Sequence, residues 1–97
     1  MASYGKAIAL KPDYADAFYN LGNILQELKR FDEALASYDR ALTLRPDLPD
    51  PLMRRGIALH YLKRFDEALA SYDRALTLRP QYVRAHFNEA LCRLLIR

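Results

Sequence analysis

The sequence predicts an all-α protein built as a right-handed superhelical stack of antiparallel helix pairs. The main observation is that one block, LKRFDEALASYDRALTLRP, occurs unchanged at 28–46 and at 62–80, an offset of 34 residues. A fixed period of this length is typical of repeat arrays. Only three glycines and five prolines occur in 97 residues, and the prolines stand where helices would begin or end. We expect one domain over 1–97, with half repeats at 1–12 and 83–97 and full repeats at 15–48 and 49–82.

The first two predicted helices lie at 1–10 and 14–28. The helix at 1–10 corresponds to the second helix of a repeat whose first helix is missing, which suggests a trimmed or designed fragment. Asp13 follows a proline and is the expected N-cap of the next helix. Gly22 within that helix indicates that a neighbouring helix approaches too closely for a side chain. Its apolar stripe, at intervals of three and four residues, consists of Phe18, Leu21, Leu25 and Leu28.

The identical block supplies two copies of one further helix, at 33–44 and 65–78. Asp32 and Glu33 are expected to cap its start, where negative charge is favoured. Small residues alternate with large ones along its buried side, so Tyr38 and its copy Tyr72 are predicted to fill the core. The remaining helices are predicted at 51–62, with a proline in the first turn, and at 82–97.

Composition excludes several classes of function. The 15 basic and 12 acidic residues are scattered along the chain, whereas nucleic-acid binders usually gather their cations on one face. No apolar run reaches the length of a membrane span, and no leader segment is evident, so we expect a cytoplasmic protein. Cys92 is the single cysteine, and His60 and His86 lack partners at a recurring catalytic or metal-binding spacing. We therefore predict no enzyme activity, no cofactor, no metal, no nucleic acid and no membrane partner.

The spacing of residues in each period resembles the tetratricopeptide repeat family, a helix–turn–helix repeat of 34 residues. The first full copy carries the resemblance at Phe18, Leu21, Gly22, Leu25, Ala34, Tyr38, Ala41 and Pro46. The second copy carries it at Leu52, Gly56, Leu59, Ala68, Tyr72, Ala75 and Pro80. The chain departs from the pattern where Arg55 and Glu89 take the place of Leu21 and where Ala90 takes the place of glycine. Residues 19–23 and 86–91 also resemble the repeat arms of bacterial relatives of O-GlcNAc transferase.

The resemblance implies a protein-interaction module that binds a peptide in a concave groove formed by the first helix of each repeat. The basic residues of these helices increase along the chain, so the acidic end of a peptide is expected near Arg54 and Arg84. The polar residues match the clamp that binds chaperone tails only in part, and chaperone binding is not predicted. Besides Gln26, the candidate partner-binding residues are Asp16, Tyr19, Asn20, Asn23, Glu27, Met53, Arg54, Ile57, His60, Tyr61, Arg84, Phe87 and Asn88.

Two alternatives remain open from the sequence. One is a self-associating or engineered repeat scaffold, in which the two end helices of different molecules meet head to tail, or in which two final helices form a two-fold dimer. The other is the substrate-recruiting arm of a larger glycosyltransferase. The candidate self-association residues are apolar and lie in the end helices: Ala7, Ile8, Leu10, Leu91, Leu94, Leu95 and Ile96.

Overall fold

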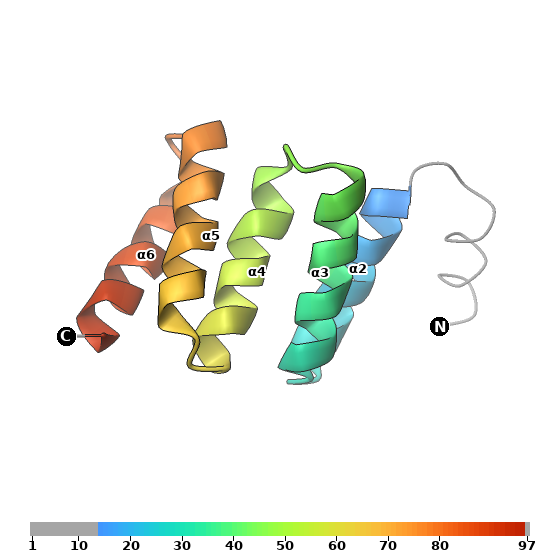
Figure 1. Ribbon diagram of the computed structural model, residues 1–97, viewed down its shortest axis with the longest axis horizontal. Coiled ribbons are helices and arrows are strands. Elements are labelled where there is room, and N and C mark those ends of the chain that lie inside the picture. Colours follow the sequence, from blue (N-terminus) through green and yellow to red (C-terminus); the bar gives the residue numbers. More distant parts are fainter. Residues whose placement is uncertain (1–13, 97) are drawn as a thin grey trace.

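The computed structural model describes residues 14–96, which form five helices stacked in the order of the sequence (Figure 1). The helices are α2 (Tyr14–Glu27), α3 (Phe31–Leu44), α4 (Pro49–Tyr61), α5 (Phe65–Leu78) and α6 (Val83–Leu95). Packing is most extensive within the pairs α2–α3 and α4–α5, and α6 packs on α5. The predicted fold class is confirmed, with antiparallel pairs that make up about two and a half repeats. The helix expected at 1–10 and the Asp13 cap fall outside the described residues.

The turn between the two helices of a pair is closed by the backbone alone. Lys29 N–H donates to the Gln26 carbonyl at 3.0 Å, and Arg30 N–H donates to the Leu25 carbonyl at 2.9 Å. The same two bonds recur one period later, around Lys63. This is a Schellman motif, in which the residue after the helix adopts the left-handed conformation. Lys29 and Lys63 occupy that position with φ of 62° and 63°.

Helix α3 begins earlier than the sequence predicted. It starts at Phe31, and Arg30 is the N-cap residue without a capping side chain, so the expected cap by Asp32 and Glu33 is wrong. Both acids lie in the first turn instead, where they still complement the positive end of the helix dipole. Glu33 forms an ion pair with Arg30.

The remaining boundaries differ from the predictions by one or two residues, except at α5, which matches. Helix α4 begins at Pro49 rather than at 51, because a proline lacks only a backbone donor that the first turn leaves unpaired anyway. Helix α6 begins at Val83 and ends at Leu95, one and two residues inside the predicted range of 82–97.

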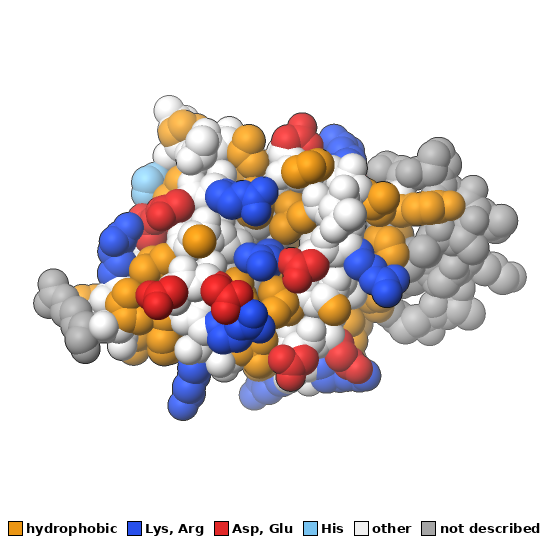
Figure 2. All heavy atoms as spheres, viewed as in Figure 1, with side chains coloured by type: hydrophobic (Ala, Val, Ile, Leu, Met, Phe, Trp, Pro, Cys, Tyr) orange, Lys and Arg blue, Asp and Glu red, His pale blue; other side chains and the backbone are white. Residues whose placement is uncertain are grey.

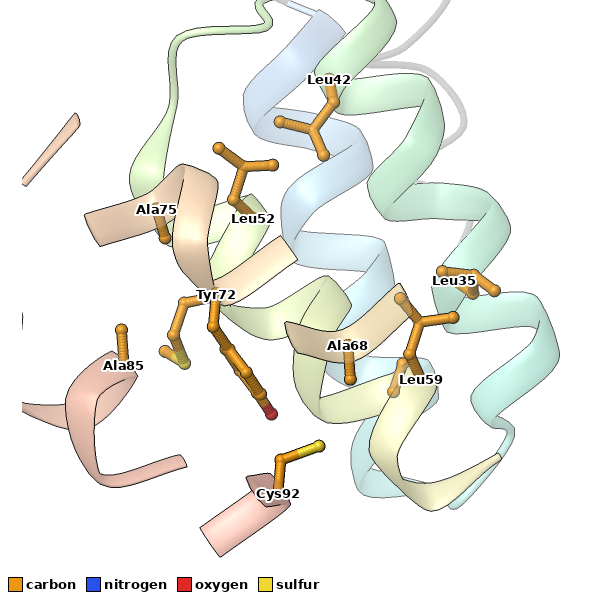
Figure 3. Close-up of a cluster of buried hydrophobic side chains, with 11 residues drawn as sticks. Leu35, Leu42, Leu52, Leu59, Ala68, Tyr72, Ala75, Ala85 and Cys92 are labelled. Atoms are coloured by element: carbon orange, nitrogen blue, oxygen red, sulfur yellow. The ribbon is translucent and has the colours of Figure 1, made fainter. Parts of the chain in front are cut away.

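The core is organised around the two equivalent tyrosines. Tyr38 and Tyr72 are 0% and 1% exposed, which confirms their predicted place in the core. Each ring lies over the glycine of the preceding helix: a Cβ added to Gly22 would lie 2.6 Å from Tyr38 Cε1. Figure 3 shows Tyr72 between side chains of α4 and α6, with its hydroxyl end pointing toward Cys92. The glycines are therefore required by close packing, as the sequence indicated.

The predicted apolar stripe of α2 is less buried than its counterpart in α4. Leu28 is 60% exposed, so its placement on the buried stripe is wrong. Leu52 and Leu59, in the registers of Phe18 and Leu25, are completely buried because they pack against both α5 and the preceding pair. The central repeat thus holds most of the core.

The same repeat position carries opposite charges at the two junctions α3–α4 and α5–α6. In the first junction, Arg55 of α4 donates to Asp39 of α3, with Nε 2.5 Å from Oδ1. In the second junction, the equivalent residues are Glu89 of α6 and Asp73 of α5. Their hydrogen bond, together with partial burial, raises the pKa of Glu89. An acid–base pair in one junction is therefore an acid–acid pair in the next.

Candidate functional site

An open groove of about 910 Å³ runs along α2, α4 and α6, the first helices of the repeats. It follows a diagonal course, from the C-terminal half of α2 to the N-terminal half of α6. Lys29 in the turn before α3, Phe31 at the start of α3 and one tyrosine of α5 complete its walls. The lining residues are Asn23, Gln26, Glu27, Lys29, Phe31, Arg54, Ile57, His60, Tyr61, Tyr72, Val83, Arg84, Phe87, Asn88 and Leu91.

The charged residues of the groove are mostly basic and lack partners. Lys29, Arg54 and Arg84 line it together with a single acid, Glu27. Within the described range 14–96, neither arginine forms an ion pair, and Arg54 Nε is buried without a hydrogen-bond partner. By contrast, acidic and basic side chains are interspersed over the face seen in Figure 2. The groove therefore carries positive charge that no neighbouring side chain neutralises.

Two amide side chains at the α2 end of the groove are held by the core. The Tyr38 hydroxyl lies 2.7 Å from Asn23 Oδ1 and 2.7 Å from Gln26 Oε1. Because a hydroxyl carries one proton, it donates to one amide, and the other amide turns its nitrogen toward the hydroxyl and donates. Burial raises the pKa of Tyr38, so this hydroxyl keeps its proton at neutral pH. Asn23 and Gln26 are consequently fixed before any ligand arrives.

The groove also presents exposed apolar and aromatic side chains. Phe87 and Val83 of α6 are 68% and 76% exposed, although both are large and apolar. At the α4 end, Phe31 and Tyr61 stack face to face, with ring centroids 4.6 Å apart and an interplanar angle of 9°. A groove with apolar walls and a few fixed polar groups is typical of a binding site.

The structure brings nine of the candidate partner-binding residues together around this groove: Asn23, Glu27, Arg54, Ile57, His60, Tyr61, Arg84, Phe87 and Asn88. Four others lie elsewhere. Asp16 and Tyr19 line a separate, small hollow of about 110 Å³, and Asn20 is exposed outside both hollows. Met53 is 1% exposed and lies in the core, where its sulfur accepts a weak hydrogen bond from Asn88 Nδ2 at 3.7 Å.

The candidate self-association residues of α6 are divided between the groove and the helix end. Leu91 lines the groove. Leu94, Leu95 and Ile96 are exposed by 62%, 52% and 42%. Ala7, Ile8 and Leu10 lie outside the described residues.

Sequence reasoning missed four of the lining residues: Lys29, Phe31, Tyr72 and Val83. Lys29 is the left-handed residue of the turn between α2 and α3, and Phe31 is the first residue of α3. Tyr72 was assigned to the core alone, but it also reaches the groove floor. Val83 begins α6, and the repeat period could have found it, because position 49 in the preceding copy also begins a helix.

The chemistry available in the groove is that of binding. The described residues contain no cluster of three or more His, Cys, Asp or Glu that could hold a metal ion. The His60 ring makes edge contacts with Tyr61 and Phe65, and His86 Nε2 lies 2.8 Å from the Pro80 carbonyl oxygen. None of the helices in the described part of the chain is long and apolar enough to cross a membrane.

The sequence pattern described as tetratricopeptide repeat matches residues 15–48 and 49–82. The chain belongs to the tetratricopeptide repeat family. The two matches coincide with the two full repeats expected from the period, and tetratricopeptide domains are typically non-catalytic interaction modules. The finer resemblance to glycosyltransferase-linked repeat arms stays a prediction.

Solved tetratricopeptide structures superimpose closely on this chain. The first tetratricopeptide domain of Spaghetti (RPAP3), bound to the HSP90 peptide SRMEEVD, has a TM-score of 0.93 at 24% identity, covering 98% of this chain and 75% of that one. The OM64 tetratricopeptide domain of Arabidopsis has a TM-score of 0.87 at 31% identity, over 93% and 74% of the two chains. MamA has a TM-score of 0.86 at 23% identity, over 94% and 53%. No curated protein matches the chain.

Proposed function

We propose that this chain is a protein-interaction module whose groove binds a peptide segment of a partner protein, with an acidic residue of that segment between Arg54 and Arg84. The observation that carries the proposal is Arg54: its Nε is buried at the groove and has no hydrogen-bond partner among residues 14–96. A buried donor without a partner costs about 1–3 kcal/mol, a cost that a bound carboxylate would remove.

The charge balance of the groove supports the same partner. Lys29, Arg54 and Arg84 face a single acid, Glu27, so an acidic segment is attracted and a basic one is repelled. The peptide in the similar RPAP3 structure, SRMEEVD, contains three acidic residues. The domain that binds that peptide is 24% identical to this chain, and the peptide serves only as an example of an acidic occupant for a groove of this fold.

The test is selection from a random peptide library displayed on phage, with the wild type, the double variant Arg54→Gln/Arg84→Gln and the control Arg74→Gln as baits. Arg74 is an exposed arginine on α5 that does not line the groove. We expect the wild type and the control to enrich peptides with acidic residues. Each groove substitution should weaken the best peptide about tenfold, or about 1.4 kcal/mol. No enrichment by the wild type, or equal enrichment by the double variant, would refute the proposal.

A second candidate function, self-association through α6, is favoured by the exposure of Leu94, Leu95 and Ile96. The repeat register argues against a head-to-tail arrangement. On α2 and α4, the face that receives the next helix carries apolar residues in two registers where α6 carries the polar residues His86 and Arg93. Light scattering over a wide concentration range separates the two: a constant mass of one chain favours the groove, and a rising mass favours self-association.

A further inference from the structure

Tyr38 and Tyr72 are the same residue of the identical block placed in two different surroundings. Both rings are buried, and both lie over a helix glycine. Their hydroxyls differ because the preceding helices differ. The Tyr38 hydroxyl contacts Asn23 and Gln26, each at 2.7 Å. At the positions 34 residues later, α4 carries Ile57 and His60 in their place.

The Tyr72 hydroxyl has no hydrogen-bond partner within residues 14–96, although the residue is only 1% exposed. Tyr72 is also the one residue of α5 that lines the groove. Its hydroxyl end points toward α6, as Figure 3 shows for Tyr72 and Cys92. The hydroxyl oxygen is not among the fully enclosed polar atoms that lack a partner, so it keeps contact with solvent and is available to an occupant of the groove.

The protonation state of this hydroxyl defines what it can bind. Burial raises the pKa of Tyr72 above its ordinary value, and the hydroxyl therefore remains a donor at neutral pH. Two side chains that line the same groove, Ile57 and Leu91, are apolar and compete for no hydrogen bond. The matching ligand group is an acceptor flanked by an aliphatic side chain, and an extended peptide offers a backbone carbonyl of that kind at every residue.

We infer that Tyr72 is a ligand-binding residue, whose hydroxyl donates a hydrogen bond to a backbone carbonyl of the peptide in the groove. This inference rests on the proposed function, because it needs a peptide in the groove. It also assigns the two repeats different roles. In the first repeat the hydroxyl is used internally to fix Asn23 and Gln26, whereas in the second it is left for the partner.

The test compares Tyr72→Phe with the matched control Tyr38→Phe. The probe is the tightest acidic peptide selected from the phage library by the wild type, labelled and titrated by fluorescence anisotropy, with urea unfolding measured in parallel. We expect Tyr72→Phe to weaken probe binding about fivefold to tenfold with little change in the unfolding midpoint. Tyr38→Phe should lower the midpoint, because it removes internal hydrogen bonds, and weaken binding about twofold or less.

The outcomes separate the two claims. If the wild type selects no peptide, the proposed function and this inference both fail. If the wild type binds and Tyr72→Phe binds equally well, only the inference fails. Should Tyr72→Phe not fold, His60→Gln provides a second test, since it supplies the amide that Gln26 gives to Tyr38 and keeps the tyrosine ring. That variant should weaken probe binding by occupying the hydroxyl, and unchanged binding would overturn the inference.

Discussion

Replacing Glu89 by Gln is expected to stabilise the chain at neutral pH, even though it removes a charged residue from a charged surface. Glu89 meets Asp73 across the junction between α5 and α6, where the equivalent junction has the Arg55–Asp39 pair. Two carboxylates in contact repel each other unless one holds a proton. A Gln side chain has the same shape and donates its amide hydrogen to Asp73 at every pH.

The size of the effect follows from the exposure of the groups. The Glu89 side chain is 17% exposed, but Asp73 is an exposed residue, so solvent screens the contact. We estimate a gain of about 1 kcal/mol for the hydrogen bond to Asp73. From this we subtract about 0.4 kcal/mol for the loss of the Glu89–Arg93 pair, whose atoms are 3.6 Å apart. The net gain of about 0.6 kcal/mol corresponds to a Tm increase of about 2–5 °C.

The pH dependence has a definite sign. The hydrogen bond with Asp73 raises the pKa of Glu89, so the folded state holds this proton more tightly than the unfolded state does. The stabilisation from this contact is complete below the unfolded pKa of about 4.3 and is lost as pH rises through the higher folded pKa. The advantage of Gln should therefore be close to zero at about pH 4 and complete at about pH 7.

The assay is urea unfolding followed by far-ultraviolet circular dichroism, at a series of pH values between these limits. Arg55→Gln is the matched control, because it places the same residue at the equivalent position of the other junction. It should lower the free energy of unfolding by about 0.5 kcal/mol at neutral pH, since it breaks the pair with Asp39. A Glu89→Gln variant that is less stable at neutral pH, or whose effect does not vary with pH, would refute the reasoning.

Two further substitutions test the packing and the turns. Gly56→Ala places a methyl group against the Tyr72 ring, whose Cδ1 would lie 2.7 Å away, and should cost about 1–3 kcal/mol in urea unfolding. Ala90→Gly, at the equivalent but exposed position of α6, should cost only about 1 kcal/mol, and equal losses would count against the tyrosine contact. Lys63→Gly should raise the free energy of unfolding by about 0.5–1 kcal/mol, and with it the Tm, because glycine adopts the left-handed conformation at φ 63° without strain. Lys63→Ala should bring no gain, and a gain as large as that of glycine would point to a lost charge instead.

The fold could be predicted from the sequence because the same pattern occurs twice. Gly22 and Gly56 indicated where helices approach closely, and the rings of Tyr38 and Tyr72 pack there. The start of α3 was predicted two residues late, although the start of the identical helix α5 was predicted correctly at Phe65. The acids after the turn were interpreted as caps, but the Schellman hydrogen bonds close the turn without them.

The groove was predicted only where the first helix of each repeat forms it. Residues carried over from the family pattern lie on α2, α4 and α6, and the period alone places them on one side of the stack. Phe31 and Tyr72 enter the groove from other elements, and their contribution depends on side-chain direction across a helix junction. Met53 occupies a groove position by register but is buried, because a long flexible side chain can turn into the core at that position.

The identity of α3 and α5 has a consequence for how such a chain can evolve. A recombination anywhere within the block shared by 28–46 and 62–80 joins the same residues on both sides of the crossover. It removes one period, together with α4, and leaves α6 to pack on a helix of unchanged sequence. The framework of the stack would survive, but the arginine and isoleucine that α4 contributes to the groove would be lost. A change in repeat number would thus alter what the groove binds without requiring a different fold.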